Sequence, residues 1–237
     1  MTAASEAAST SASKVRLRFA KIGELRLVSH HDLMRCLERA IRRAAIPVAH
    51  SQGFNPRPRV VFALALGLGI EGHREVVELE LAEPMPPAEV LRRLAGVAPP
   101  GLVFLEAEPR GAGRAPRAEA ALYALDVPAD RRDAARAALA ALLAGDRWPY
   151  TRHRPDRTVA IDLRPFVLGA DLDPNGVLRL HLKVTPEGSA RPEEVLDALG
   201  LRDLLEGGTV LARTDLTLAD RAEPGGRTPA GGDPRIS

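Results

Sequence analysis

Residues 29–59 read SHHDLMRCLERAIRRAAIPVAHSQGFNPRPR, and no other stretch of the chain concentrates so much polar chemistry. Ser29 followed by Asp32 is the capping-box pattern that begins a helix. The apolar positions that follow recur at helical spacing: Leu33, Leu37, Ile41 and Ala44. Pro47 disfavours helical geometry in the residue before it. We therefore predict a helix that begins after Ser29 and ends before Pro47.

A strand is predicted ahead of this helix. Residues 14–20 alternate between apolar and basic side chains, which is typical of a half-buried strand. Residues 25–28 are expected to extend the strand after a turn at Gly23.

Further elements complete a first unit of residues 14–108. They are an extended segment over residues 48–62 that the SQGFNPRP loop interrupts, a strand over 76–81, a helix from Pro86 to Gly96, and a strand over 101–106. The resulting order of strand, helix, strand, strand, helix and strand is that of a ferredoxin-like unit.

The rest of the chain predicts a second unit of the same order. Residues 109–118 are rich in Gly, Arg and Pro and indicate a linker, after which residues 119–219 form the second unit. Its elements are a strand over 122–127, a helix over 130–144, a hairpin of 158–168 with 177–184, a helix over 191–199 and a strand over 210–218. We expect residues 1–13 and 220–237 to be a disordered leader and tail. The predicted fold class is α+β, with tandem ferredoxin-like units and antiparallel-rich sheets.

The composition excludes several classes of protein. The 237 residues include one cysteine, Cys36, which cannot form a disulfide framework within the chain or supply the thiolates of a zinc site or an iron–sulfur cluster. The histidines are scattered without a metal-ligand spacing, so we expect no metal site. The chain has neither an apolar run that approaches a membrane span nor the features of a signal peptide. We expect a cytoplasmic protein with no membrane partner.

Positive charge gathers in the first quarter of the chain. The whole chain carries a formal net charge of +2, whereas residues 14–59 hold eleven Lys and Arg against Glu24, Asp32 and Glu38, a local net charge of +8. Such a region can hold phosphate-rich partners. The alternative is a solvated helix face. Only three of the 33 basic residues are Lys, so arginine is common throughout the chain and a cluster of arginines need not mark a binding site.

The loop at residues 51–58 is the most specific feature. Pro56 and Pro58 favour extended geometry in the residues before them and remove two backbone donors. Arg57 and Arg59, two apart along an extended segment, then point to the same side. The candidate RNA- and phosphate-binding residues are Arg35, Arg39, Gln52, Phe54, Asn55, Arg57 and Arg59, with Phe54 available to stack on a base. The alternative is a rigid structural hairpin with solvated arginines.

His30 is the one candidate for a catalytic role. It occupies the first turn of the predicted helix, where the positive helix end disfavours a protonated imidazole. A neutral histidine beside a basic loop can act as a general base in RNA cleavage by 2′-hydroxyl attack. The alternative is that His30 packs against the turn and His31 is exposed.

The strands offer two further polar faces. In the first unit, Arg16 and Arg18 are expected opposite Glu78 and Glu80, which would neutralise that face, and the lack of aromatic residues there argues against an RRM-type stacking platform. In the second unit, one face of the predicted hairpin forms a second basic surface of Arg164, Arg179, His181 and Lys183. Its alternative is a solvent-facing sheet in which Asp162 pairs with an arginine.

Three segments resemble a known bacterial family. They are VRLRFAKIGELRLVSHHDLMR at residues 15–35, SQGFNPRP at residues 51–58 and IDLRPF at residues 161–166, and they are similar to radical SAM-linked, or radical SAM-associated, proteins. Members of that family are fused behind, or encoded beside, a radical SAM protein, often near ribonuclease E/G genes. The resemblance covers residues 14–218 and implies a radical SAM partner. With one cysteine in this chain, an iron–sulfur cluster and S-adenosylmethionine are expected only on the partner, and no cofactor here.

These observations lead to one preferred function and two alternatives. We expect a non-catalytic accessory module that binds tRNA or rRNA through its basic first unit and docks on a radical SAM protein. The first alternative is a metal-independent endoribonuclease with His30 as general base and the loop arginines stabilising the phosphate. The second alternative is an adaptor that binds only protein.

Overall fold

The computed structural model describes residues 12–111, 113–154, 156–186 and 188–219 of the chain. Most of the predicted leader and all of the predicted tail therefore lie outside the described residues. Among the helices of the described part, none is long and apolar enough to cross a membrane.

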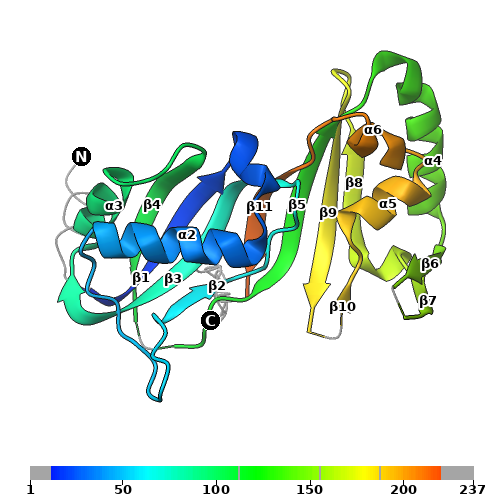
Figure 1. The fold of residues 1–237 in the computed structure, drawn as a ribbon. Helices are drawn as coiled ribbons and strands as arrows, with labels where there is room; N and C mark the ends of the chain where they lie inside the picture. Colours follow the sequence, from blue (N-terminus) through cyan, green and yellow to red (C-terminus); the bar gives the residue numbers. More distant parts are fainter. Residues whose placement is uncertain (1–11, 112, 155, 187, 220–237) are drawn as a thin grey trace, which may run out of the picture.

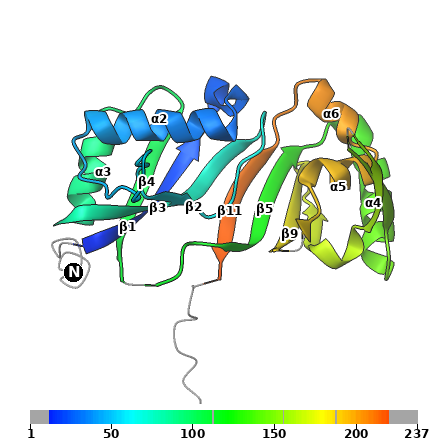
Figure 2. The same cartoon turned by 60° about the horizontal axis from the view of Figure 1, so that its bottom comes forward.

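The first half of the chain builds one layer of strands under two helices (Figure 1). Its elements are β1 (Ala12–Lys21), the 3₁₀ helix η1 (Gly23–Leu27), α2 (His30–Arg43), β2 (Val60–Phe62), β3 (Glu71–Met85), α3 (Pro87–Ala95) and β4 (Leu102–Arg110). The strands lie side by side in the order β4, β1, β3, β2, and all these pairs are antiparallel. Helices α2 and α3 cover one face of this layer (Figure 2).

Helix α2 begins and packs as its sequence predicts. The N–H of Asp32 donates to the Ser29 hydroxyl at 3.2 Å, which satisfies one of the free donors at the helix start. The apolar face is buried at Leu33, Leu37, Ala40 and Ile41. These side chains join β1 and β3 residues in a hydrophobic core beneath the helix.

The expected strand extension over residues 25–28 is wrong. Gly23 adopts a φ of 62°, a left-handed conformation that turns the chain sharply. The chain then winds into η1, so the sheet strand ends at Lys21.

The second half builds a similar layer from later strands. Its elements are β5 (Ala118–Asp126), η2 (Ala129–Arg131), α4 (Arg132–Ala144), β6 (Pro149–His153), β7 (Thr158–Asp162), η3 (Arg164–Phe166), β8 (Val167–Leu172), β9 (Val177–Thr185), β10 (Gly188–Ser189), α5 (Pro192–Ala198), α6 (Arg202–Glu206) and β11 (Ala212–Leu218). The strand order is β8, β9, β5, β11, and β10 also pairs with β9. A second hydrophobic core lies between these strands and their helices.

The predicted hairpin of residues 158–168 with 177–184 is wrong in its first half. β7 pairs with β6 in a separate two-stranded sheet, and it is β8, not β7, that pairs with β9. Asp162 ends β7 because its Oδ1 accepts the backbone N–H groups of Trp148 at 2.7 Å and Arg164 at 3.1 Å. This carboxylate favours a turn through η3, where Pro165 has no N–H to give to a ladder.

The two halves share one sheet. β11 lies beside β3 in parallel register, with Ala212 opposite Glu71 and Arg213 opposite Gly72. In the described part of the chain, nine strands therefore form one mostly antiparallel sheet, which confirms the predicted α+β class. The description of the two halves as tandem ferredoxin-like units stays a prediction.

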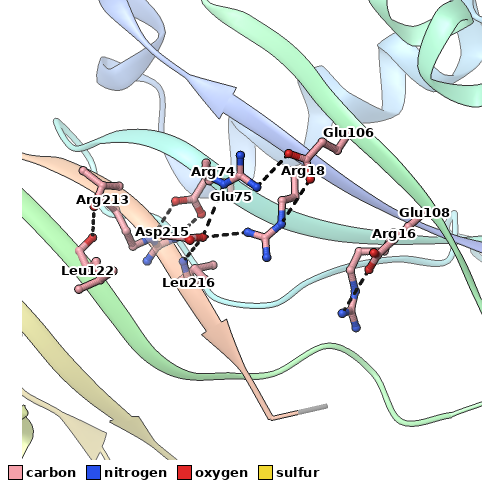
Figure 3. Close-up of polar contacts among 11 residues, drawn as sticks. Arg16, Arg18, Arg74, Glu75, Glu106, Glu108, Leu122, Arg213, Asp215 and Leu216 are labelled. Carbon is pink, nitrogen blue, oxygen red and sulfur yellow. Dashed lines mark hydrogen bonds and ion pairs between the residues drawn. The ribbon is translucent and has the colours of Figure 1, made fainter. Parts of the chain in front are cut away.

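The outer face of the first layer is an ion-pair network. Arg16 donates to Glu78 at 2.6 Å, which confirms that predicted pair. The predicted pairing of Arg18 with Glu80 is wrong, because the register places Arg18 opposite Val76. Arg18 instead reaches Asp215 of β11 at 2.8 Å, as Figure 3 shows.

Candidate functional site

The exposed side of α2 carries a stripe of basic residues. Its members, at positions i, i+4, i+8 and i+11, are His31, Arg35, Arg39 and Arg42. Residues spaced three and four apart lie on the same side of a helix. Burial of the apolar side therefore fixes the direction in which these side chains project.

A hairpin stands beside this helix. Its base is closed by the N–H of Arg59, which donates to the Ala49 carbonyl at 2.7 Å, and by the N–H of Ser51, which donates to the Arg57 carbonyl at 2.8 Å. The Ser51 hydroxyl accepts the N–H of Arg57 at 3.0 Å. These bonds hold residues 51–57 together in a loop that projects from the body of the molecule (Figure 1).

A groove of about 390 Å³ separates α2 from the hairpin. The helix contributes His31, Met34, Arg35, Glu38 and Arg42, and the hairpin contributes His50, Pro56, Arg57 and Pro58. We call these residues the α2 groove. The structure thus brings together Arg35 and Arg57 of the predicted set.

The arginines of the α2 groove form few ion pairs and hydrogen bonds with the described part of the protein. Arg35 lies 3.3 Å from the exposed Asp32 carboxylate. Within the described ranges, neither a carboxylate nor a carbonyl engages the guanidinium groups of Arg42 and Arg57. The pKa of Asp32 is lowered, first by the hydrogen bond from the Ser29 hydroxyl and then by Arg35. The groove is therefore a positively charged cleft in which the guanidinium N–H groups of Arg42 and Arg57 are available to a ligand.

Other members of the predicted set lie around the groove rather than in it. Arg39 is exposed on α2, and Gln52 and Asn55 are exposed on the hairpin. Phe54 is fully exposed, at 105%. Arg59 donates to Glu80 of β3 at 2.9 Å, and this bond ties its side chain to the sheet. Arg59 does not line the groove.

His30 does not line the α2 groove. Its ring packs edge-on against Phe62 of β2, with centroids 5.1 Å apart. Its Nδ1 is buried and has no hydrogen-bond partner among the residues that the structure describes. Burial lowers the His30 pKa, and the nearby positive charges of His31, Arg213 and Lys21 lower it further. The ring is therefore held in a setting that favours its neutral form, but it lies outside the groove that holds Arg57.

Sequence reasoning overlooked four polar residues of the groove: His31, Glu38, Arg42 and His50. The helical spacing of His31, Arg35 and Arg42 was a signal that could have found the helix wall. His50 gave no local signal, because its position depends on the pairing of the hairpin base with Pro58.

Of the predicted second basic surface, Arg179, His181 and Lys183 lie at alternate positions of β9, whereas Arg164 does not lie on that strand. Arg164 lies in η3 and donates to the Gly145 carbonyl at 3.0 Å and the Val167 carbonyl at 2.9 Å, near the end of α4. Arg179 lies on β9 and is paired with Asp171 and Asp173. His181 and Lys183 border a different cavity, of about 570 Å³. The expected pairing of β7 with β9 is wrong, and binding at this surface stays a prediction.

A polar cavity of about 470 Å³ in the second half offers a useful contrast. There Arg152 donates to both oxygens of the buried Glu194, at 2.5 and 2.7 Å. The Tyr150 hydroxyl donates to Asp197 at 2.8 Å, and burial together with that carboxylate raises the pKa of Tyr150 to about 12. In this cavity the side-chain donors and acceptors are paired with one another, whereas the guanidinium groups of Arg42 and Arg57 in the α2 groove have no such partners among the described residues.

Within the described part of the chain, no group of three or more His, Cys, Asp or Glu side chains is placed to hold a metal ion. The α2 groove is thus the strongest candidate site on the structure. Its chemistry is that of arginine and histidine side chains toward an anionic ligand.

Residues 14–192 match a family model described as an uncharacterized protein conserved in bacteria (DUF2344). The matched range includes α2, the hairpin and every residue of the α2 groove. No curated protein matches the chain.

Proposed function

The chain belongs to the DUF2344 family of bacterial proteins, and we propose that it is an RNA-binding accessory protein of a radical SAM enzyme. The α2 groove is the observation that carries the RNA-binding part. The resemblance of residues 15–35, 51–58 and 161–166 to radical SAM-associated proteins carries the partner.

The arginines of the α2 groove support a phosphate ligand. Arg35 and Arg42 stand on one wall and Arg57 on the other. The N–H donors of a guanidinium group lie in one plane and match the positions of phosphate oxygens. When such a group neutralises an RNA phosphate, counterions are released from the RNA, which favours binding. Since Arg42 and Arg57 are not held by internal acceptors in the described part of the chain, a phosphate does not have to displace any.

The hairpin tip supports RNA in particular. A phenylalanine side chain on a monomer surface is normally at least partly covered, yet Phe54 is fully exposed beside the groove. Exposed aromatic rings next to basic clefts are the platforms on which unpaired bases stack. The proposed role is to hold tRNA or rRNA for a radical SAM protein, whose cluster and S-adenosylmethionine this chain does not supply. A link to ribonuclease E/G is part of the same proposal.

Binding to tRNA and rRNA fragments over a range of salt concentrations tests the RNA-binding part. The double substitution of Arg35 and Arg57 to Ala should weaken binding and reduce the slope of log K against log salt by about 0.7 for each phosphate that is no longer neutralised. The matched control is the double substitution of Arg92 and Arg136 to Ala, which removes two exposed arginines from α3 and α4. Absence of binding at low salt, or equal effects of both double variants, would exclude RNA as the ligand of this groove.

The partner needs its own test. Co-purification of the radical SAM protein with this chain should be detectable from native lysate. If the complex survives nuclease treatment and the chain shows no RNA affinity, the protein-only adaptor is correct instead.

An endoribonuclease remains a second candidate because two histidines, His31 and His50, line the same basic groove. Cleavage by 2′-hydroxyl attack needs a base to take the hydroxyl proton and an acid to protonate the leaving 5′ oxygen, and a histidine pair can supply both. The original candidate, His30, packs against Phe62 instead. Cleavage in EDTA that is lost in His31→Ala or His50→Ala, but kept in His30→Ala, would favour this enzyme.

A further inference from the structure

Of the described residues that line the α2 groove, Glu38 is the one that is acidic. It lies on α2 between Arg35 and Arg42 and is half-buried. Among the residues that the structure describes, none forms an ion pair or hydrogen bond with its carboxylate. A carboxylate without a partner therefore shares the cleft with three arginines.

This carboxylate is unfavourable for a site that binds phosphate alone. Like charges repel, so a phosphate in the groove interacts less well with the protein when Glu38 is present. What a carboxylate can accept is a pair of N–H donors, one on each oxygen. In a nucleic acid such donors belong to the bases.

Guanine is the base that fits a carboxylate best. Its Watson–Crick edge presents two adjacent donors, N1–H and the 2-amino group. Cytosine and adenine present an amino group next to an acceptor nitrogen, and uracil presents one N–H between two carbonyl oxygens. Only guanine therefore offers both carboxylate oxygens a donor without placing an acceptor against one of them.

The same reasoning requires an unpaired strand. In a duplex the Watson–Crick edge of guanine is occupied by cytosine, and the deep major groove of RNA does not admit side chains. The α2 groove has two walls and a volume of about 390 Å³, which suits a strand rather than a duplex. The exposed Phe54 ring gives a neighbouring unpaired base a surface on which to stack.

We infer that the α2 groove holds single-stranded RNA and that Glu38 selects an unpaired guanine within it. Arg35, Arg42 and Arg57 hold the flanking phosphates, and Glu38 determines the specificity. This inference rests on the proposed RNA binding.

The test compares short RNA oligonucleotides that differ at one central base in a run of uridines. The wild-type protein should bind the guanosine oligonucleotide roughly tenfold more tightly than the all-uridine one, the value of a hydrogen bond to a charged group. Inosine, which lacks the 2-amino group, should lose most of this preference. Annealing the complementary strand should weaken binding and abolish the preference.

Substitutions of Glu38 separate base selection from simple charge. Glu38→Ala should raise affinity for the all-uridine oligonucleotide and reduce the guanosine preference to less than about twofold. Glu38→Gln, which keeps one acceptor oxygen without the charge, should retain part of the preference. Thermal unfolding of both variants checks that the fold is intact.

Two outcomes would overturn the inference in different ways. If Glu38→Ala strengthens binding to every oligonucleotide equally, or if the duplex binds as well as the single strand, Glu38 does not select a base although RNA binding stands. If the wild-type protein binds none of the oligonucleotides and no tRNA, the proposed function fails as well.

Discussion

Arg213 of β11 and Glu75 of β3 form an enclosed ion pair at the junction of the two halves. The Arg213 Nε donates to Glu75 Oε1 at 2.8 Å and its Nη2 donates to Oε2 at 2.5 Å, and both side chains are 2% exposed. The same guanidinium donates to the carbonyls of Leu64 and Ala65. One buried cation therefore joins β11, β3 and the segment that precedes β3. Figure 3 shows the Arg213–Glu75 pair.

Substitution Glu75→Gln should strongly destabilise the fold. It leaves the Arg213 charge buried without a counter-charge, and the loss of one partner of a buried pair costs about 3–5 kcal/mol. Urea denaturation measures the change. The control is Glu106→Gln, which removes an exposed partner of Arg74 and should cost less than about 1 kcal/mol. Equal losses would mean that burial of the Arg213–Glu75 pair has no special role.

Substitution Gly72→Ala should disturb the same pair through sterics. An added Cβ at Gly72 would lie 2.5 Å from Glu75 Cγ, so the carboxylate would have to move. We expect a loss of about 1–3 kcal/mol, as for overpacked interiors. Gly169→Ala is the matched control, because its added Cβ meets nothing within 4 Å. A Gly72→Ala protein as stable as the control would contradict the steric account.

Stability should fall as the pH drops below the ordinary histidine pKa of 6.5, with His30 as one cause. The folded state lowers the pKa of His30, mainly by burial, so the unfolded chain binds its proton first. The stabilising contribution is complete above pH 6.5 and is lost as the pH falls toward the folded-state pKa. Urea midpoints at pH 7.5 and 5.5 should differ less for His30→Asn than for wild type. His31→Asn, at an exposed position, is the control, and an unchanged difference in His30→Asn would show that other groups account for the pH dependence.

Substitution Ser29→Ala should weaken the start of α2. The Ser29 hydroxyl accepts the N–H of Asp32 and donates to its carboxylate at 2.7 Å. Loss of an N-cap of this kind costs about 0.5–2 kcal/mol, which thermal unfolding can measure. Ser29→Asp, which keeps a cap acceptor, should recover a large part of that loss. Failure of Ser29→Asp to recover any stability would contradict a capping role.

Substitution Phe54→Ala should lower RNA affinity without changing stability. The ring is fully exposed, so its removal deletes no packing within the described residues. Stacking of one base on an aromatic ring is worth about 1–3 kcal/mol, which corresponds to about 5-fold to 150-fold in Kd. Leu68→Ala, at another exposed apolar residue, is the control. Unchanged affinity in Phe54→Ala would show that the hairpin tip does not contact a base.

Local patterns in the sequence predicted the elements whose partners are near or whose periodicity is strong. The cap at Ser29 and the spacing of Leu33, Leu37 and Ile41 define α2, because capping and burial act within one helix. The alternation over residues 14–20 defines β1 for the same reason. The pairing of Arg16 with Glu78 followed from the predicted strand order.

The errors arose where a single residue overrides a pattern. Residues 158–168 have the alternation of one strand, yet Asp162 binds two backbone N–H groups and divides them into β7 and β8. Arg164 therefore lies in η3 and not opposite β9 as expected. Residues 25–28 looked extended, but the left-handed turn at Gly23 directs them into η1.

The sequence alone determined where α2 begins, which of its sides is apolar, and that the hairpin carries arginines between prolines. Those properties depend on caps, periodicity and restricted backbone angles, which act over a few residues. Only the tertiary structure decided that His30 packs against Phe62, that His31, Glu38 and His50 share a groove with Arg57, and that β11 joins β3 through Arg213 and Glu75. These relationships depend on long-range register and on the burial of charge, and neither is encoded within a short stretch of chain.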